Sequence, residues 1–277
     1  MKRIAILLSA MILAVSASAA SRVYELKSPD GKLSVAVEAG EGLSYTLSHD
    51  GDLLLDKSPL EMCLEDGTVF GGVQPVKKVT RRSVNETLRT VVYKKAQVKD
   101  VFNEMTLKFK KFSLVFRAYD DGMAYRFVSH VKTPYNVESE VVKFNFAQDW
   151  NMWAAYVTHN TYSLEGQYFT SNEAQYTYTP LSQWNKERIA MLPLMVDGPS
   201  GKKIVVTEAD NRDYPCFYLY NYDEGKELTS RFPAFPKELK QGGHNNLQMI
   251  VESREGYIAK CEGEQAFPWR VVAVSEN

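Results

Sequence analysis

An alternation of apolar with polar or small residues runs through most of the chain beyond its first 20 residues. Leu33, Val35 and Val37 are separated by single small or polar residues, and the segment 43–47 repeats the pattern. A period of two places one set of side chains on the buried face of a β-strand and the other set on its exposed face. The pattern therefore predicts strands that pair into sheets.

Further strand-like segments follow at short intervals along the chain. They are residues 91–93, 105–109, 114–116, 123–128, 141–146, 189–196, 204–206, 217–220, 247–251 and 271–274. Turn sequences separate them: Pro-Asp-Gly at 29–31, Asp-Gly at 50–51, 66–67, 121–122 and 197–198, and Gly-Gly at 242–243. Such residues tolerate the positive φ angles of tight hairpins. Beyond the first 20 residues, no segment of ten or more residues has a convincing helical period. Many short strands over this length predict an all-β fold, a large antiparallel sandwich rather than a small barrel.

The first 19 residues have the layout of a signal peptide. Lys2 and Arg3 are basic, residues 4–15 are apolar and uncharged, and residues 17–19 (Ala-Ser-Ala) offer the small side chains of a cleavage site. The apolar run is shorter than the roughly 20 residues of a membrane-spanning helix; the alternative is a buried N-terminal helix. We expect export to the periplasm or the extracellular space, with one mature domain over residues 20–277. No cysteine stands directly after the cleavage site, so we expect no lipoprotein anchor.

Net charge limits the classes of binding partner that we expect, and the cysteines bear on metal binding and disulfides. Removal of Lys2 and Arg3 takes two positive charges from a formal net charge of −1 and leaves about −3. We therefore expect neither nucleic acid nor anionic lipid as a partner. The three cysteines, Cys63, Cys216 and Cys261, do not lie at metal-ligand spacing. Cys63 and Cys216 lie among apolar residues, which predicts small buried thiols rather than a disulfide.

One segment, residues 150–184, departs from the alternation. It combines aromatic residues with Asn, Gln, Ser, Thr and Glu: Trp150, Trp153, Tyr156, Tyr162, Tyr168, Phe169, Tyr176, Tyr178 and Trp184. Aromatic faces stack on the C–H faces of pyranose rings, and a connection this long without secondary structure is more often functional than idle. Tyr168, Glu173 and Trp184 are our candidate substrate-binding residues. The alternative is that these aromatic residues pack between two sheets.

The sequence contains none of the motifs that would specify a familiar active site. A Gly-x-Ser-x-Gly elbow, a Walker loop, a dinucleotide fingerprint and a His-Glu-x-x-His helix are all absent from it. The four histidines, His49, His130, His159 and His244, lie far apart in the sequence. A metal site or triad assembled from them stays open as an alternative.

A cluster of acidic residues follows one of the predicted strands. Residues 207–215 read Thr-Glu-Ala-Asp-Asn-Arg-Asp-Tyr-Pro and come directly after the segment 203–206. Glu208 therefore emerges at the end of a strand, with Asp210 and Asp213 close by. Oxygen ligands on such a loop suit Ca²⁺, which takes about six to eight of them. An ordinary solvated turn has the same composition, so both interpretations remain open at this point.

Four segments together point to a known family. They are Ser-Pro-Asp-Gly-Lys at 28–32, Arg-Ala-Tyr-Asp-Asp-Gly-Met-Ala-Tyr-Arg-Phe at 117–127, Pro-Leu-Met-Val at 193–196 with the acidic element after it, and Phe-Pro-Trp-Arg-Val-Val at 267–272. In order and spacing they resemble the N-terminal domain of glycoside hydrolase family 97. The second segment is similar to that family's Arg-Ala-Tyr-x-Asp-Gly-x-Ala-Tyr-Arg-Phe hairpin, and the four cover nearly the whole mature chain.

The resemblance implies a fold and an activity. Members of the family are bacterial exo-acting α-glycosidases, mostly α-glucosidases or α-galactosidases, and they typically depend on Ca²⁺. Their N-terminal domain is a mutarotase-like β-super-sandwich that packs on a (β/α)₈ barrel and contributes a Glu to the calcium site. By match to the family's Thr-Glu-Ala motif, Glu208 is that residue. The expected fold is thus an all-β, large antiparallel β-super-sandwich.

In the family the barrel supplies the catalytic carboxylates, whereas this sequence stops at Asn277, where the linker to the barrel is expected. Glycoside cleavage requires two carboxyl groups roughly 5 to 9.5 Å apart. We therefore expect no catalytic residue in this chain and only weak Ca²⁺ binding by it alone. Three hypotheses follow: a fragment of a family 97 enzyme whose barrel lies on another segment or polypeptide, a stand-alone module that binds an α-linked oligosaccharide, and a mutarotase-like epimerase. The last requires a His/Glu pair that the sequence does not place.

Overall fold

The computed structural model describes residues 21–158 and 163–276. In this part of the chain the regular structure is β-strand, apart from four short 3₁₀ turns: η1 (Gly166–Tyr168), η2 (Leu181–Gln183), η3 (Pro199–Gly201) and η4 (His244–Asn246). The predicted all-β fold class is therefore confirmed. The predicted signal peptide and His159 lie outside the described residues. No helix in the described part is long and apolar enough to cross a membrane.

One layer of the fold is built mainly from the N-terminal strands. In order of pairing it contains β1 (Arg22–Lys27), β2 (Leu33–Ala39), β3 (Leu43–His49), β4 (Asp52–Leu64), β10 (Tyr135–Phe146), β16 (Glu227–Arg231) and β15 (Tyr218–Tyr220), all antiparallel. Two short strands extend it: β5 (Val69–Phe70) pairs with β4, and β19 (Ala259–Cys261) pairs with β10. The pairing of β10 with β4 and β16 brings the middle of the chain into this layer.

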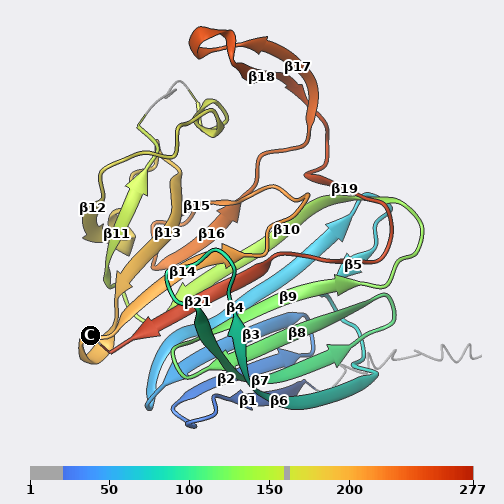
Figure 1. Ribbon diagram of the computed structural model, residues 1–277, viewed down its shortest axis with the longest axis vertical. Helices are drawn as coiled ribbons and strands as arrows, with labels where there is room; N and C mark the ends of the chain where they lie inside the picture. The colour runs from blue at the N-terminus through green and yellow to red at the C-terminus, as the bar shows by residue number, and fades with distance from the viewer. Residues whose placement is uncertain (1–20, 159–162, 277) are drawn as a thin grey trace, which may run out of the picture.

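The other layer is also antiparallel and carries most of the remaining strands. In order of pairing it contains β6 (Lys78–Arg89), β7 (Gln97–Lys108), β8 (Phe112–Tyr119), β9 (Gly122–Ser129), β21 (Trp269–Ser275), β14 (Lys203–Ala209), β13 (Ala190–Asp197), β11 (Asn151–Tyr156) and β12 (Thr177–Pro180), with β20 (Gln265–Ala266) on β9. Ala190 pairs with Leu219 of β15, so the two layers are one sheet folded onto itself. Figure 1 shows the strands running across the body of the molecule.

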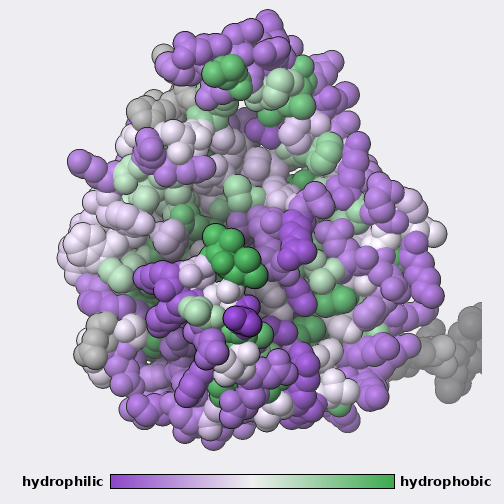
Figure 2. Space-filling view, in the orientation of Figure 1, coloured by the Kyte–Doolittle hydropathy of each residue, from purple (hydrophilic) through white to green (hydrophobic). Residues whose placement is uncertain are grey.

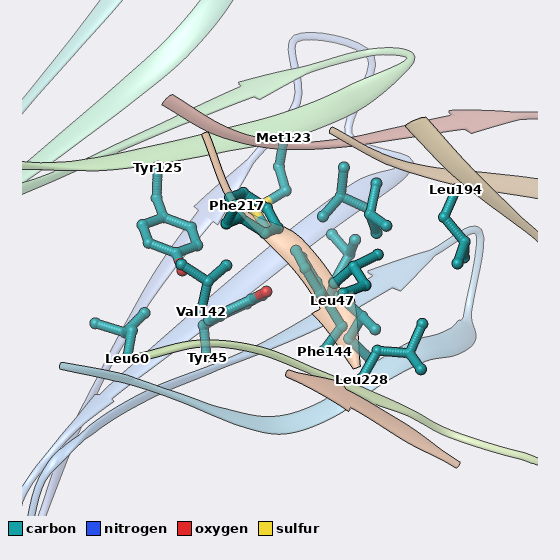
Figure 3. Close-up of a cluster of buried hydrophobic side chains, with 14 of the residues drawn as sticks. Tyr45, Leu47, Leu60, Met123, Tyr125, Val142, Phe144, Leu194, Phe217 and Leu228 are labelled. Atoms are coloured by element: carbon teal, nitrogen blue, oxygen red, sulfur yellow. The ribbon is translucent and has the colours of Figure 1, made fainter. Parts of the chain in front are cut away.

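The hydrophobic core lies between the two layers. The ring of Tyr45 on β3 lies 5.9 Å from that of Phe116 on β8 and 5.4 Å from that of Tyr125 on β9. Figure 3 shows side chains of both layers meeting in this cluster. Leu33 and Val35, part of the alternation that predicted a strand, are fully buried on the same face of β2. The alternation in the sequence thus arises because one face of each strand is buried in this single core.

Two hairpins extend beyond the core. The β6–β7 hairpin ends in a turn in which Val91 is 97% exposed and Val92 94% exposed. Strands β17 (Pro236–Gly242) and β18 (Gln248–Arg254) form a separate two-stranded sheet, at the top of Figure 1, with Leu247 81% exposed before β18. Both hairpins carry hydrophobic patches on the otherwise largely hydrophilic face in Figure 2.

Three local predictions are wrong. Residues 91–93 are a turn rather than a strand, because the chain reverses between β6 and β7 and no neighbouring strand buries these hydrophobic residues. The segment 150–184 is not a structureless connection, since it includes β11 and β12. The three cysteines are free thiols, but Cys216 is exposed in the loop before β15, whereas Cys261 on β19 is the buried one.

Candidate functional site

Glu208 lies near the end of β14 and points between the two layers. Ile204 and Val206, two and four residues earlier on the same strand, are fully buried, and the alternation places the Glu208 side chain on the same face. Its register partner on β21 is Arg270. Because side chains of paired residues lie on the same face of a sheet, the strand pairing itself brings this carboxylate and this guanidinium together.

Arg270 connects Glu208 to the opposite layer. Its Nε and Nη2 atoms donate to the two carboxylate oxygens of Glu140 on β10, at 2.9 and 2.6 Å. Its Nη1 atom donates to Oε2 of Glu208 at 2.7 Å. The hydroxyl of Tyr214 donates to Glu140 at 2.9 Å. These four residues form the Arg270 cluster, a polar link through the apolar core.

Burial controls the electrostatics of the Arg270 cluster. The Arg270 side chain is fully buried and that of Glu140 is 2% exposed, whereas Glu208 is 12% exposed at the mouth of the cluster. Burial opposes the charged form of Arg270, but the charge and hydrogen bonds of Glu140 outweigh it and raise the Arg270 pKa. Burial also raises the pKa of Glu208, and the neighbouring Arg270 charge offsets this only in part. With both carboxylates ionised the cluster carries one excess negative charge, close to Glu208.

On the other face of the same strands, two arginines enclose Trp269. The guanidinium carbons of Arg117 on β8 and Arg126 on β9 lie 4.6 and 4.2 Å from the centre of the indole ring. Arg126 also contacts Asp210 at 3.4 Å, just beyond Glu208. The 117–127 segment therefore places its two arginines where cation–π contacts and an ion pair tie the β8–β9 hairpin to β21 and to the Glu208 loop.

The acidic loop does not gather its carboxylates into a metal site by itself. Asp210 is engaged by Arg126 and by Arg212, the latter at 2.9 Å, and Asp213 is exposed. Across residues 21–158 and 163–276, no group of three or more His, Cys, Asp or Glu side chains is arranged to hold a metal ion. Glu208 offers one oxygen, Oε1, whose contact within the chain is a 3.3 Å hydrogen bond from the amide of Asn211. This donor set suits one contribution to a shared cation site, not a complete one.

Comparison with known proteins decides the family. The model of the family described as Glycosyl-hydrolase 97 N-terminal matches residues 26–277. The chain belongs to this family. As the sequence motifs implied, Glu208 and Arg270 are thus residues of a family 97 N-terminal domain.

The relatives that share this domain are longer than this chain. A retaining alpha-galactosidase from Bacteroides thetaiotaomicron is 38% identical over 277 residues, which is 99% of this chain but 42% of that protein. A family 97 enzyme from Pseudoalteromonas sp. strain K8, solved in complex with acarbose, aligns with 92% of this chain and 36% of its own, with a TM-score of 0.72 and 19% identity. A beta-arabinopyranosidase aligns with a TM-score of 0.74 and 20% identity, over 91% of this chain and 40% of its own. The two structures share the fold, and the chain spans less than half the length of each of these proteins.

The three predicted substrate-binding residues of the family 97 domain do not lie together in one exposed site. Trp184 is 4% exposed, with its indole N–H donated to the carbonyl of Arg188 at 3.0 Å, so it packs in the core. Tyr168 is half-buried and donates its hydroxyl to the carbonyl of Phe232 at 3.1 Å. Glu173 is exposed. Trp184 thus packs in the core, which was the alternative to sugar binding for the aromatic residues of this segment. Tyr168 and Glu173 remain at least partly accessible.

The sequence interpretation passed over a better exposed aromatic pair. Trp153 on β11 and Tyr178 on β12 are 38% and 48% exposed, and their ring centres lie 4.6 Å apart. Trp153 lies between the buried residues Met152 and Ala154. A large aromatic residue at an outward position of a strand could have indicated a binding surface in the sequence. That inference requires the strand itself to be predicted first.

Proposed function

We propose that this family 97 N-terminal domain belongs to an exported α-glycosidase, with α-galactosides as the first substrate class to test. In this proposal the domain supports the active site. It holds Glu208 at the edge of a catalytic site whose other residues come from another segment or polypeptide. The observation that carries the proposal is the position of Glu208: a fully buried arginine fixes one carboxylate oxygen and leaves the other near the surface. The 38% identity to a retaining alpha-galactosidase supports the substrate class, and the basic-apolar-small pattern of residues 1–19 supports export.

The chain's own carboxylates argue against hydrolysis by this domain alone. Glu140 and Glu208 are bound to the same guanidinium, and the Glu140 side chain is 2% exposed inside the sandwich. An acid and a nucleophile must both reach the glycosidic bond, one to protonate oxygen and one to attack carbon. Glu140 cannot reach a sugar from within the core, so we place the catalytic carboxylates outside this domain.

Calcium is the cation we propose for Oε1 of Glu208, the oxygen that Arg270 does not bind. Bound there, Ca²⁺ would supply a fixed positive charge beside the substrate. The chain's contribution is orientation: Arg270 and Asn211 limit the rotation of the Glu208 carboxylate, and the excess negative charge of the Arg270 cluster favours a cation at its mouth. The two projecting hairpins, with Val91, Val92 and Leu247 exposed, offer apolar surface for the polypeptide that completes the site.

Hydrolysis by the purified chain is the first test. Assays with p-nitrophenyl α-galactoside and α-glucoside, with and without Ca²⁺, should show no turnover above the buffer rate. Calcium-dependent turnover that Glu208→Gln removes would show that catalysis resides in this domain and would overturn the proposal.

Calcium affinity tests the role of Glu208 directly. In a full-length family 97 protein that carries this domain, Glu208→Gln should weaken Ca²⁺ binding in a calorimetric titration by at least about tenfold, since a charged ligand is lost. Asp213→Asn, which changes an exposed carboxylate of the same loop, is the matched control and should leave the affinity unchanged. Equal affinities for both variants and the parent would remove Glu208 from the site.

A further inference from the structure

A flat aromatic and polar surface lies on the outer face of the second layer, apart from the Arg270 cluster. Trp153 and Tyr178 are register partners on β11 and β12, and their rings are inclined by 38° with centres 4.6 Å apart. Two neighbouring rings of this kind, each more than a third exposed, form a continuous apolar platform. Exposed aromatic rings contribute less stabilisation than buried ones. A ligand that covers this pair would bury its apolar surface, which makes the pair a candidate binding surface.

A row of polar groups borders this platform. Asn151 lies two residues before Trp153 on β11, and Asp197 lies two residues after Met195, the partner of Trp153 on β13. Lys203, the partner of Asp197, extends the row onto β14. Residues two apart on a strand share a face about 7 Å apart. The polar row therefore runs beside the rings on the same outer surface.

Hydrogen bonds hold the platform in a fixed arrangement. The Tyr178 hydroxyl donates to Oδ2 of Asp197 at 2.8 Å and accepts from the amide of Asn151 at 3.1 Å. The ammonium of Lys203 lies 2.8 Å from Oδ1 of Asp197. Burial opposes ionisation of Asp197, but the bonds from Lys203 and Tyr178 outweigh it and lower its pKa. Ring position and acceptor charge are thus set before any ligand arrives, which reduces the entropy cost of binding.

We propose that Trp153, Tyr178, Asn151, Asp197 and Lys203 form a binding site for a neutral α-linked oligosaccharide. The aromatic faces match the C–H face of a pyranose ring. The carboxylate, amide and ammonium groups match the hydroxyls at its edge, which both donate and accept hydrogen bonds. A lipid or an apolar peptide would bury the donors and acceptors that these groups do not use among themselves without supplying partners for them, at a cost for each one buried.

This site is separate from the one that contains Glu208. Trp153 pairs with Met195, which pairs with Val205 on β14, and Val205 alternates with the buried Val206. Trp153 therefore lies on the outer face of the layer, whereas Glu208 lies on the inner face and three residues further along β14. A ligand can occupy the platform whether or not the Glu208 site is complete, and only the α linkage of the ligand rests on the function proposed above.

Calorimetric titration of the purified chain with maltotetraose and with stachyose tests the site. We expect binding of at least one of them, weakened about tenfold or more by Trp153→Ala through loss of the stacked ring. Tyr178→Phe keeps the ring but loses the hydroxyl that orders Asp197 and Asn151, and should weaken binding about threefold. Tyr222→Ala removes another exposed ring, 51% exposed, and is the matched control that should bind like the parent.

The outcomes separate the two proposals. Glu208→Gln should leave this affinity unchanged, because its carboxylate lies on the other face of the layer. No binding of either oligosaccharide would overturn the platform site and leave the role of Glu208 untouched. Binding that survives Trp153→Ala would also overturn it, since the sugar would then lie elsewhere. Denaturant midpoints equal to the parent's show that the variants are folded.

Discussion

The two faces of the second layer, from β12 and β11 through β13 and β14 to β21, carry sites of opposite character. On the inner face, Arg270 is fully buried and bonded to two carboxylates from different layers. On the outer face, Trp153 and Tyr178 are exposed and bordered by polar groups from adjacent strands. The strands that carry both sites are consecutive neighbours in one layer.

The difference teaches how each site depends on the fold. A buried ion pair that loses one partner leaves an uncompensated charge in the core, so loss of Arg270 alone or Glu140 alone should cost folding free energy. An exposed platform loses only its ligand contacts, because water replaces whatever is removed. We therefore expect mutations of the buried Arg270–Glu140 pair to affect stability strongly, and mutations of the platform to affect mainly binding.

The largest effect is expected for Arg270→Met. This change leaves Glu140 buried with only the Tyr214 hydroxyl as a partner, and should lower the free energy of unfolding by about 3 to 5 kcal/mol. Urea denaturation followed by circular dichroism measures it. The double variant Arg270→Met, Glu140→Gln removes the unpaired charge and should recover most of the loss. If the single variant costs less than about 1 kcal/mol, within the range of exposed ion pairs, the cluster is not the buried link described above.

The fold was largely predictable from the sequence, because a single core imposes the alternation of residues such as Val35 and Val37 on each strand. β6 was not predicted, since its residues are nearly all exposed and carry no alternation. Glu208 could be singled out by its motif, but Glu140, the other carboxylate that Arg270 binds, is 68 positions away and nothing local marks it. Such pairings depend on how the two layers stack, which local pattern does not encode. For the same reason Trp184 could be named as a candidate substrate-binding residue although it packs in the core.

A smaller effect is expected for Arg126→Met on the outer face near Glu208. The variant loses the cation–π contact with Trp269 and the ion pair with Asp210, together worth about 1 kcal/mol in the free energy of unfolding. Hydrogen exchange of residues 209–213 should increase, because the Asp210 contact fastens that loop to β9. Lys99→Met, on the exposed β6–β7 hairpin, controls for the loss of a surface cation. Unchanged exchange would mean that the loop is held from the inner face alone.

Glu208→Gln should change stability only modestly, and in the opposite direction. The folded-state pKa of Glu208 is raised above its ordinary value of 4.5, chiefly by burial. The folded protein therefore binds the Glu208 proton more tightly than the unfolded chain, and stability falls as pH rises from 4.5 through the folded-state pKa. Glutamine does not ionise, so the variant avoids this loss of stability. Its free energy of unfolding should equal that of the parent below pH 4.5 and exceed it by up to about 1 kcal/mol at neutral pH. Denaturation of both proteins across this range gives the difference curve, and a loss of stability at neutral pH would show that the Arg270 pairing outweighs burial.

The smallest effect on stability is expected for Trp153→Ala. Trp153 is 38% exposed and so contributes less to the core than a fully buried tryptophan, and the free energy of unfolding should change by less than about 1 kcal/mol. Alanine at Trp269, which is 8% exposed between two arginines, is the contrasting variant and should cost several times more. The same denaturation experiment measures both tryptophans. Equal losses at the two positions would mean that the platform is part of the core packing, and the separation of the two faces into a folding site and a ligand site would fail.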